Sequence, residues 1–176
     1  MIRVWDPFVR AFHWALALSF AVAWFSSEDM ELVHSAAGYV AGALVAARIA
    51  WGFVGPPYAR FSRFVRAPGA VLAYLEAIAK RSEKRFIGHN PAGGAMIVVL
   101  LAAMAAAVAT GWLLTTDAFW GSTAAQHVHS IVAHGVLLLV FLHLAGVALS
   151  SVRHRENLVR AMVVGVKRAA EPGDVT

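Results

Sequence analysis

Four long stretches without a charged residue constrain the fold of this 176-residue chain more than any other feature. They cover residues 11–27, 32–47, 86–116 and 118–152, and the second continues past Arg48 to Val54. A membrane-spanning helix needs about 20 mostly apolar residues, and backbone groups in lipid must form their hydrogen bonds internally. The sequence therefore predicts an all-α fold, an integral membrane four-helix bundle with helices at about 8–25, 32–53, 91–115 and 124–152.

The composition agrees with a membrane protein and excludes several other classes. Hydrophobic residues make up 60% of the chain and charged residues only 14%, whereas a soluble domain is closer to one half and one quarter. The chain has no cysteine, which excludes disulfides, iron–sulfur clusters, thiol catalysis and covalently attached c-type haem.

The distribution of charge predicts how the bundle is oriented. All 15 Lys and Arg residues precede the first span, end the second, lie in the 55–89 loop or follow the fourth. The other two connections carry only acidic charges, Glu28, Asp29, Glu31 and Asp117. Because positive residues stay on the cytoplasmic side, we expect both termini in the cytoplasm and the chain in a bacterial inner membrane. The net charge of +5 then reflects cytoplasmic loops and does not indicate nucleic acid binding.

The segments outside the spans predict a single domain over residues 1–168. Within the 55–89 loop, residues 70–84 have apolar side chains at helical spacing and a basic end. This pattern is typical of a helix that lies on an anionic membrane surface. Residues 169–176 are expected to form a flexible tail.

Histidines inside the apolar spans are the candidate functional residues, because ionisable groups in a membrane are costly and usually functional. His129 and His143 are 14 residues apart on the fourth span. They therefore share one helix face, at heights that differ by about 21 Å. Two flat macrocycles about 10 Å across fit on that face one above the other.

Matching heights give each of these two histidines a partner on another helix. The fourth span runs toward the cytoplasm, so His129 lies near the outer side with His34, and His143 lies near the inner side with His13. The pairs His34/His129 and His13/His143 predict two bis-imidazole sites for the iron of non-covalent haem b, one near each membrane face.

Other residues in the spans each allow two interpretations. Arg48 lies near the height of the inner pair, where it forms a salt bridge to a propionate of the inner haem or reaches out to the inner surface. Gly38 and Gly42 form a G-x-x-x-G pattern, which is typical of close helix packing and also makes room for a ring on the second span. His127 and His134 share a face away from the predicted ligands, and their roles stay open.

Several motifs, in order along the chain, resemble the bacterial cytochrome b561 and Ni,Fe-hydrogenase-type cytochrome b family. They are residues 4–7 (VWDP), 12–14 (FHW), 33–34 (VH), 38–39 (GY), 88–94 (GHNPAGG), 143–146 (HLAG) and 154–159 (HRENLV). The resemblance covers almost the whole chain and implies a four-helix membrane cytochrome with two haem b groups that exchanges electrons with quinone. The ligand histidines of that family fall on His13, His34, His129 and His143, in agreement with the helix heights.

These features together predict an electron relay and not a bond-breaking enzyme. Quinone or quinol is the expected membrane substrate, with His89 and nearby Arg85 as candidate binding residues; a tight loop that caps the third span is the alternative interpretation. Acidic outer connections suit the positive docking face of a periplasmic partner such as a c-type cytochrome, and they repel superoxide.

Three other functions are compatible with parts of the pattern. They are a superoxide:quinone oxidoreductase, the cytochrome b subunit of a larger oxidoreductase, and a haem-free histidine relay for protons or metal ions. Association with membrane lipid follows from the spans themselves, and a homodimer is an assembly that these features allow.

Overall fold

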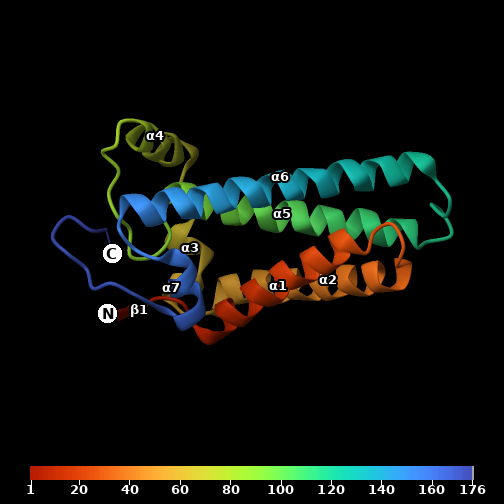
Figure 1. The fold of residues 1–176 in the computed structure, drawn as a ribbon, viewed down its shortest axis with the longest axis horizontal. Helices are drawn as coiled ribbons and strands as arrows, with labels where there is room; N and C mark the ends of the chain where they lie inside the picture. Colours follow the sequence, from red (N-terminus) through yellow and green to blue (C-terminus); the bar gives the residue numbers. More distant parts are fainter. Residues whose placement is uncertain (176) are drawn as a thin grey trace. The chain divides into compact units, whose positions relative to one another are not determined.

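The structure, a computed structural model, describes residues 1–175 and is built almost entirely of helices (Figure 1). Four of the helices in this range are long and apolar enough to cross a membrane: α1 (Pro7–Phe25), α2 (Glu31–Val54), α5 (Pro91–Leu114) and α6 (Thr123–Arg153). Every predicted boundary lies within one residue of the observed one. The expectation of an all-α chain with four membrane-spanning helices is therefore confirmed.

Local chemistry explains where these helices begin. The Asp6 carboxylate accepts a hydrogen bond from the Val9 backbone N–H (3.1 Å) directly before α1. The Asn90 side chain accepts one from the Gly93 N–H (2.7 Å) before α5. In both cases the first helical residue is proline, which lacks the N–H that a helix start would leave unpaired.

The chain divides into two compact units. Unit 2 consists of Ala11–Ile49 and Leu100–Val140, and unit 1 contains residues 1–10, 50–99 and those from 141 onward. The divisions fall inside the four long helices, so each of these helices contributes one segment to each unit.

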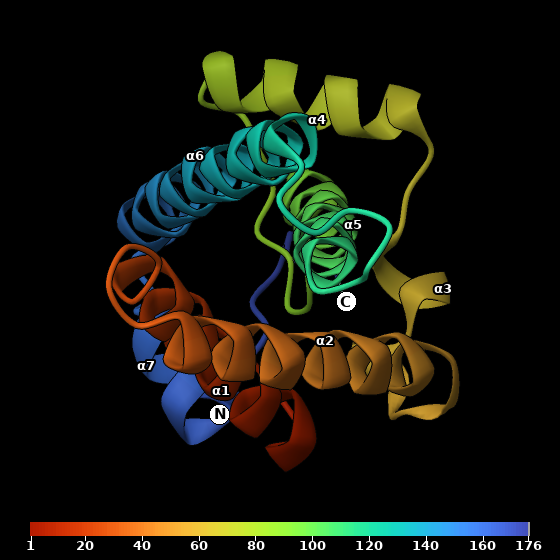
Figure 2. The same cartoon turned by 90° about the vertical axis from the view of Figure 1, so that its right-hand side faces the viewer.

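Unit 2 is formed by helix segments and two short connections. Figures 1 and 2 both show α5 and α6 side by side, joined by the turn at residues 115–122. Most buried side chains of this unit are small or apolar, and they include Ala37, Ala41, Val45, Met104 and Val136; Arg48 is the charged exception. Small side chains let helix backbones approach closely in a membrane, where lipid removes the hydrophobic drive for association.

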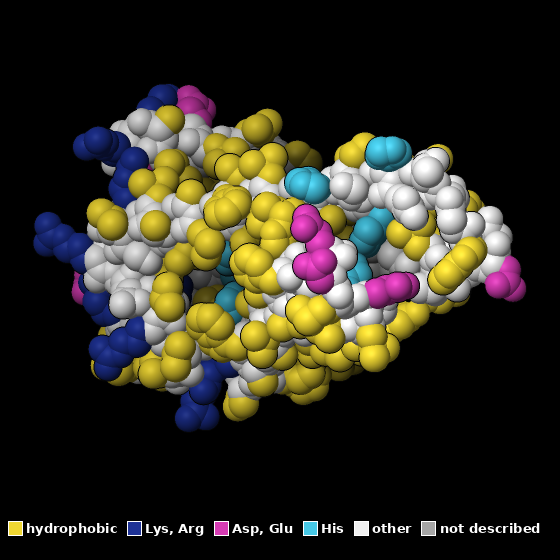
Figure 3. All heavy atoms as spheres, turned by 45° about the vertical axis from the view of Figure 1, so that its right-hand side comes forward, with side chains coloured by type: hydrophobic (Ala, Val, Ile, Leu, Met, Phe, Trp, Pro, Cys, Tyr) yellow, Lys and Arg dark blue, Asp and Glu magenta, His cyan; other side chains and the backbone are white. Residues whose placement is uncertain are grey.

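Unit 1 contains the shorter elements, η1 (Pro57–Ala59), α3 (Phe61–Phe64), α4 (Pro68–Ala79) and α7 (Leu158–Val164), and an antiparallel pair of strands, β1 (Ile2–Arg3) and β2 (Val166–Lys167). Its buried core comprises Val4, Trp5, Ile87 and Ala161. Fourteen of the 15 Lys and Arg residues belong to this unit, with Arg48 as the exception. On the face shown in Figure 3 these side chains gather over unit 1.

Gly165 connects α7 to β2 in a conformation that requires glycine. Its φ is +85°, in the left-handed region, and a Cβ there would lie 2.8 Å from the Trp5 carbonyl oxygen. The Gly165 carbonyl in turn accepts hydrogen bonds from the Val4 and Trp5 N–H groups (2.9 and 3.1 Å). This residue therefore stops α7 and joins the two ends of the chain.

The predicted surface helix within 70–84 is observed as α4, which is displaced toward the N-terminus and ends at Ala79. The helix stops there because Arg81 adopts a left-handed φ of 56°. Leu72 and Leu75 on this helix are 66% and 47% exposed, as expected of side chains that face lipid and not protein.

The segment after residue 168 makes more contacts than a flexible tail would. The Val175 N–H donates to the Arg85 carbonyl, and the Val175 carbonyl accepts from the Ile87 N–H, both at 2.9 Å. These bonds form an isolated parallel β-bridge between Phe86 and Val175, which links the end of the described chain to the 85–87 loop. Thr176, the last residue of the predicted tail, lies outside the described residues.

Candidate functional site

Two half-buried imidazoles lie close together in unit 2. His34 lies in the first turns of α2 and His129 in the second turn of α6. Their ring centres are 6.1 Å apart, and the ring planes are nearly perpendicular, at 88°. The structure thus brings together the two histidines that the sequence predicts as the outer pair.

The end of α1 fixes the ring of His34. Its Nδ1 donates a hydrogen bond to the Ala23 carbonyl oxygen (2.7 Å). Ala23 lies in the last turn of α1, where carbonyl groups have no partner within the helix. A carbonyl oxygen only accepts, so the proton is on Nδ1 and the Nε2 lone pair is available to a metal.

A single hydroxyl on α5 fixes the ring of His129. Thr110 donates its hydroxyl proton to the Ala106 or Ala107 carbonyl (2.8 and 3.1 Å) and accepts from His129 Nδ1 (3.0 Å). The next residue, Gly111, lets the ring lie close, because a Cβ there would be 3.1 Å from His129 Cε1. His129 therefore also presents Nε2 as the available nitrogen.

Sequence reasoning did not identify Thr110, Gly111 or Ala23 as part of this site. A signal for Thr110 was present, since it is the only hydroxyl residue in the 91–114 span. The role of the Ala23 carbonyl cannot be predicted from the sequence, because any residue at that helix end supplies the same backbone atom.

The distance between the two ring centres agrees with a metal ion held between them. Metal–imidazole bonds are about 2.0 Å long and the ring nitrogen lies about 1 Å from the ring centre, so two ligand rings stand about 6 Å apart. The observed separation is 6.1 Å. Within residues 1–175 no three His, Asp or Glu side chains converge, so a cofactor that brings its own equatorial nitrogens, such as haem, suits this pair better than a bare ion.

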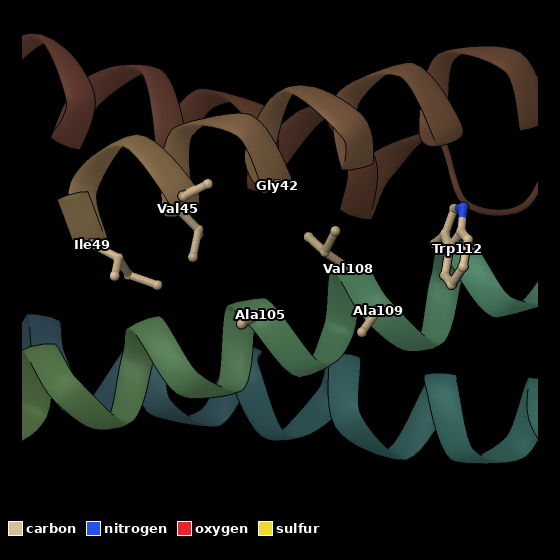
Figure 4. A pocket seen from close by; sticks show the side chains of 8 residues that line it. Gly42, Val45, Ile49, Ala105, Val108, Ala109 and Trp112 are labelled. Atoms are coloured by element: carbon tan, nitrogen blue, oxygen red, sulfur yellow. The ribbon is translucent and has the colours of Figure 1, made fainter.

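The two glycines of the G-x-x-x-G pattern on α2 have different surroundings. A Cβ on Gly42 would lie 2.8 Å from Val108 Cγ1, whereas nothing lies within 4 Å of the corresponding position on Gly38. Figure 4 shows Gly42 and Val108 at an apolar groove of about 360 Å³ between α2 and α5. Gly42 therefore serves helix packing, and Gly38, one turn after His34, leaves room for a flat ring.

The remaining histidines in the spans differ in their surroundings. His134 is exposed, with Nδ1 donating to the Ser130 carbonyl (2.8 Å) and the ring 5.1 Å from Trp24. His127 is also exposed. His13 lies in unit 2, edge-on to Trp14, and His143 lies in unit 1, so the pairing of these two stays a prediction from the sequence.

Comparison with known proteins agrees with a haem protein. Residues 4–165 match the family described as prokaryotic cytochrome b561. The chain belongs to this family. It is accordingly a multi-pass membrane protein of electron transfer that binds haem b. Neither a search of the curated proteins nor a search of the solved structures finds a match.

The arginine on the second span of this cytochrome b561 family member is buried. Arg48 is 3% exposed, which argues against a guanidinium that reaches out to the membrane surface. The sequence alternative, a salt bridge to a haem propionate, agrees with burial and stays a prediction.

The structure gives the two candidate quinone residues different surroundings. Arg85 is buried and donates to Glu156 (2.7 Å), to Asp174 (2.5 Å) and to two backbone carbonyls. Its donors are therefore engaged in linking the loop to the C-terminal segment, and this position argues against Arg85 as a quinone ligand. His89 lies with its ring 4.6 Å from the rings of both Trp5 and Phe64.

A buried lysine completes the polar cluster around Arg85. Lys167 Nζ lies 3.9 Å from Glu156 and over the Trp5 ring at 5.5 Å. Burial lowers the pKa of Lys167 to about 8, although the Glu156 carboxylate raises it. Burial by itself would raise the pKa of Glu156, but hydrogen bonds from Arg85 and from the Arg168 backbone N–H hold it below its ordinary value.

Proposed function

We propose that this protein is a dihaem b-type cytochrome that relays electrons between the membrane quinone pool and a periplasmic redox partner, a c-type cytochrome. The observation that carries the proposal is the His34–His129 pair, with ring centres 6.1 Å apart and each Nδ1 occupied by a hydrogen bond. Haem held there would supply reversible one-electron chemistry.

The residues around the outer site would determine its redox properties. The Ala23 carbonyl and the Thr110 hydroxyl orient the two rings and raise their basicity as ligands, since a ligand that donates from its other nitrogen is more electron-rich. Space beside Gly38 accommodates the ring, and the apolar side chains of unit 2 keep water away.

A second site is proposed from the sequence at His13 and His143. His143 lies 14 residues after His129 on one continuous helix, α6, so the two imidazoles share a face at heights about 21 Å apart. The resemblance of the sequence to the family supports His13 and His143 as the ligands, and Arg48 is proposed to bind a propionate of this inner haem.

The charge of the connections supports a cationic periplasmic partner. Unit 2 contains Glu28, Asp29, Glu31 and Asp117, and its one Lys or Arg is the buried Arg48. A negative surface attracts a partner with a positive docking face and slows the approach of an anion such as superoxide. With both termini placed in the cytoplasm by the positive-inside rule, these carboxylates face the periplasm.

The quinone is proposed to bind on the cytoplasmic side near His89. The His89 ring lies beside two aromatic rings, Trp5 and Phe64, and an imidazole can donate a hydrogen bond to a quinone oxygen. We omit Arg85 from this site because its guanidinium is bound to two carboxylates.

Stopped-flow mixing of the purified protein tests the proposed exchange of electrons with quinol and with a c-type cytochrome. Quinol is expected to reduce the haem, and an oxidised, positively charged c-type cytochrome to reoxidise it, with a rate that falls as ionic strength rises. Changing Glu28 and Asp29 to Gln and Asn would weaken that dependence. Fast reduction by superoxide, with no exchange with either form of the cytochrome, would identify a superoxide:quinone oxidoreductase instead.

A further inference from the structure

Unit 1 contains a polar cavity that the electron-transfer proposal does not use. Its volume is about 480 Å³. Four guanidinium groups, one imidazole and two carboxylates line it; they belong to Arg85, Arg153, His154, Arg155, Arg168, Glu171 and Asp174. The cavity lies where α6 ends, at Arg153.

Three of the four arginines have a carboxylate partner. Arg85 binds Glu156 and Asp174, Arg153 binds Glu83 at 2.9 Å, and Arg168 binds Glu171. The first two of these pairs are largely buried, whereas the side chains of Arg168 and Glu171 are 39% and 57% exposed. An exposed pair of this kind is weak and easily exchanged for another anion.

Arg155 is the cation of the cavity that lacks such a partner. Within residues 1–175 no carboxylate lies in salt-bridge distance of its guanidinium. Its φ of 50° is in the left-handed region, so the backbone turns away from the axis of α6 and places Arg155 in the cavity wall. Arg168 adds an unused donor, since its buried Nε has no hydrogen-bond partner in the described part of the chain.

We infer that this cavity binds a phosphate group through Arg155 and Arg168, with Glu171 displaced from Arg168. Guanidinium groups bind phosphate oxygens through paired N–H donors, which the ammonium group of lysine does not provide. The group can belong to an anionic phospholipid, because Arg155 follows the end of a spanning helix by two residues, at headgroup level. Free phosphate has the same chemistry, so the test must separate the two sources.

Thermal unfolding of the purified full-length protein in detergent provides the test. The apparent Tm is measured with inorganic phosphate, with a short-chain phosphatidylglycerol and with a short-chain phosphatidylcholine. Each ligand is applied to the wild type and to Arg155→Gln and Arg168→Gln. Arg160→Gln is the matched control, because Arg160 is an exposed arginine of α7 that does not line the cavity.

The expected result is a rise in Tm with phosphatidylglycerol that is retained in Arg160→Gln and falls by half or more in Arg155→Gln and Arg168→Gln. An equal rise with inorganic phosphate identifies a free-phosphate site, and a rise with phosphatidylglycerol alone identifies a headgroup site. The inference is wrong if neither phosphate compound stabilises the wild type more than phosphatidylcholine does, or if all four proteins respond alike.

Discussion

His34 and His129 each use one ring nitrogen for a hydrogen bond to the protein, which leaves the other nitrogen of each ring available to iron. The acceptors differ: the Ala23 carbonyl is part of the backbone, whereas Thr110 supplies a side-chain hydroxyl. A side-chain acceptor can be removed without changing the helix, so the contribution of such a bond is testable at Thr110.

Thr110→Val is expected to weaken haem binding at the outer site and to raise its midpoint potential. Valine keeps the shape of threonine, but it removes the hydroxyl that contacts His129 Nδ1, and loss of such a partner typically lowers affinity about 10- to 100-fold. Haem content and redox titration measure both effects. Thr116→Val is the control, since Thr116 donates only to the Leu113 carbonyl (2.6 Å), and equal behaviour of the two variants would contradict the assignment.

Because of Lys167, the free energy of unfolding is expected to rise with pH in the alkaline range. Burial lowers its folded-state pKa to about 8, from 10.5 in the unfolded chain, so between these values the unfolded state binds more protons and stability rises with pH. The effect is on the order of 3 kcal/mol at most.

Apparent Tm values from pH 7 to 10.5 test this expectation. The wild type should gain stability relative to Lys167→Met above about pH 8. Lys80→Met serves as the control with the same loss of charge at an exposed position. The difference between its apparent Tm and that of the wild type should stay constant with pH. A constant difference between the wild type and Lys167→Met would rule out the proposed titration.

At the scale of helices and loops, sequence reasoning succeeded where the information is local. Uncharged runs and capping residues such as Asn90 predict the four long helices to within one residue, because length and polarity alone decide where a chain crosses a membrane. Helix rise predicts that His34 and His129 lie at similar heights, and the structure has the two rings close together; their role as haem ligands stays a prediction. The elements that were missed, α3, α7 and the β1–β2 pair, are two to seven residues long and depend on distant contacts. Arg85, for example, meets Asp174 across 89 positions of sequence, which no periodic pattern records.

Gly42→Leu is expected to destabilise unit 2 by about 1–3 kcal/mol, because a side chain there overpacks the contact between α2 and α5. Its Cβ alone would lie 2.8 Å from Val108. Gly135→Leu, on α6 of the same unit, is the matched control, since a Cβ at Gly135 meets nothing within 4 Å. The apparent Tm should fall for Gly42→Leu and change little for Gly135→Leu, and a greater loss in Gly135→Leu would contradict this account of helix packing.

At the scale of the whole molecule, charge and histidines are sorted along the four spans. The basic residues are almost all in unit 1, and unit 2 contains both the acidic connections and the His34–His129 pair. Under the proposed function, the acidic connections would meet a cationic partner and the basic residues would meet anionic lipid. This arrangement suits electron exchange between the membrane interior and a cationic protein at its outer surface.

A redox titration of the purified protein, followed by its reduced-minus-oxidised absorption spectrum, tests the central claim most directly. We predict two one-electron haem b components in the wild type. One and the same component should disappear in His34→Ala and in His129→Ala, while His127→Ala, at an exposed position of α6, keeps both. A colourless protein, or two intact components after the loss of His34, would contradict the account.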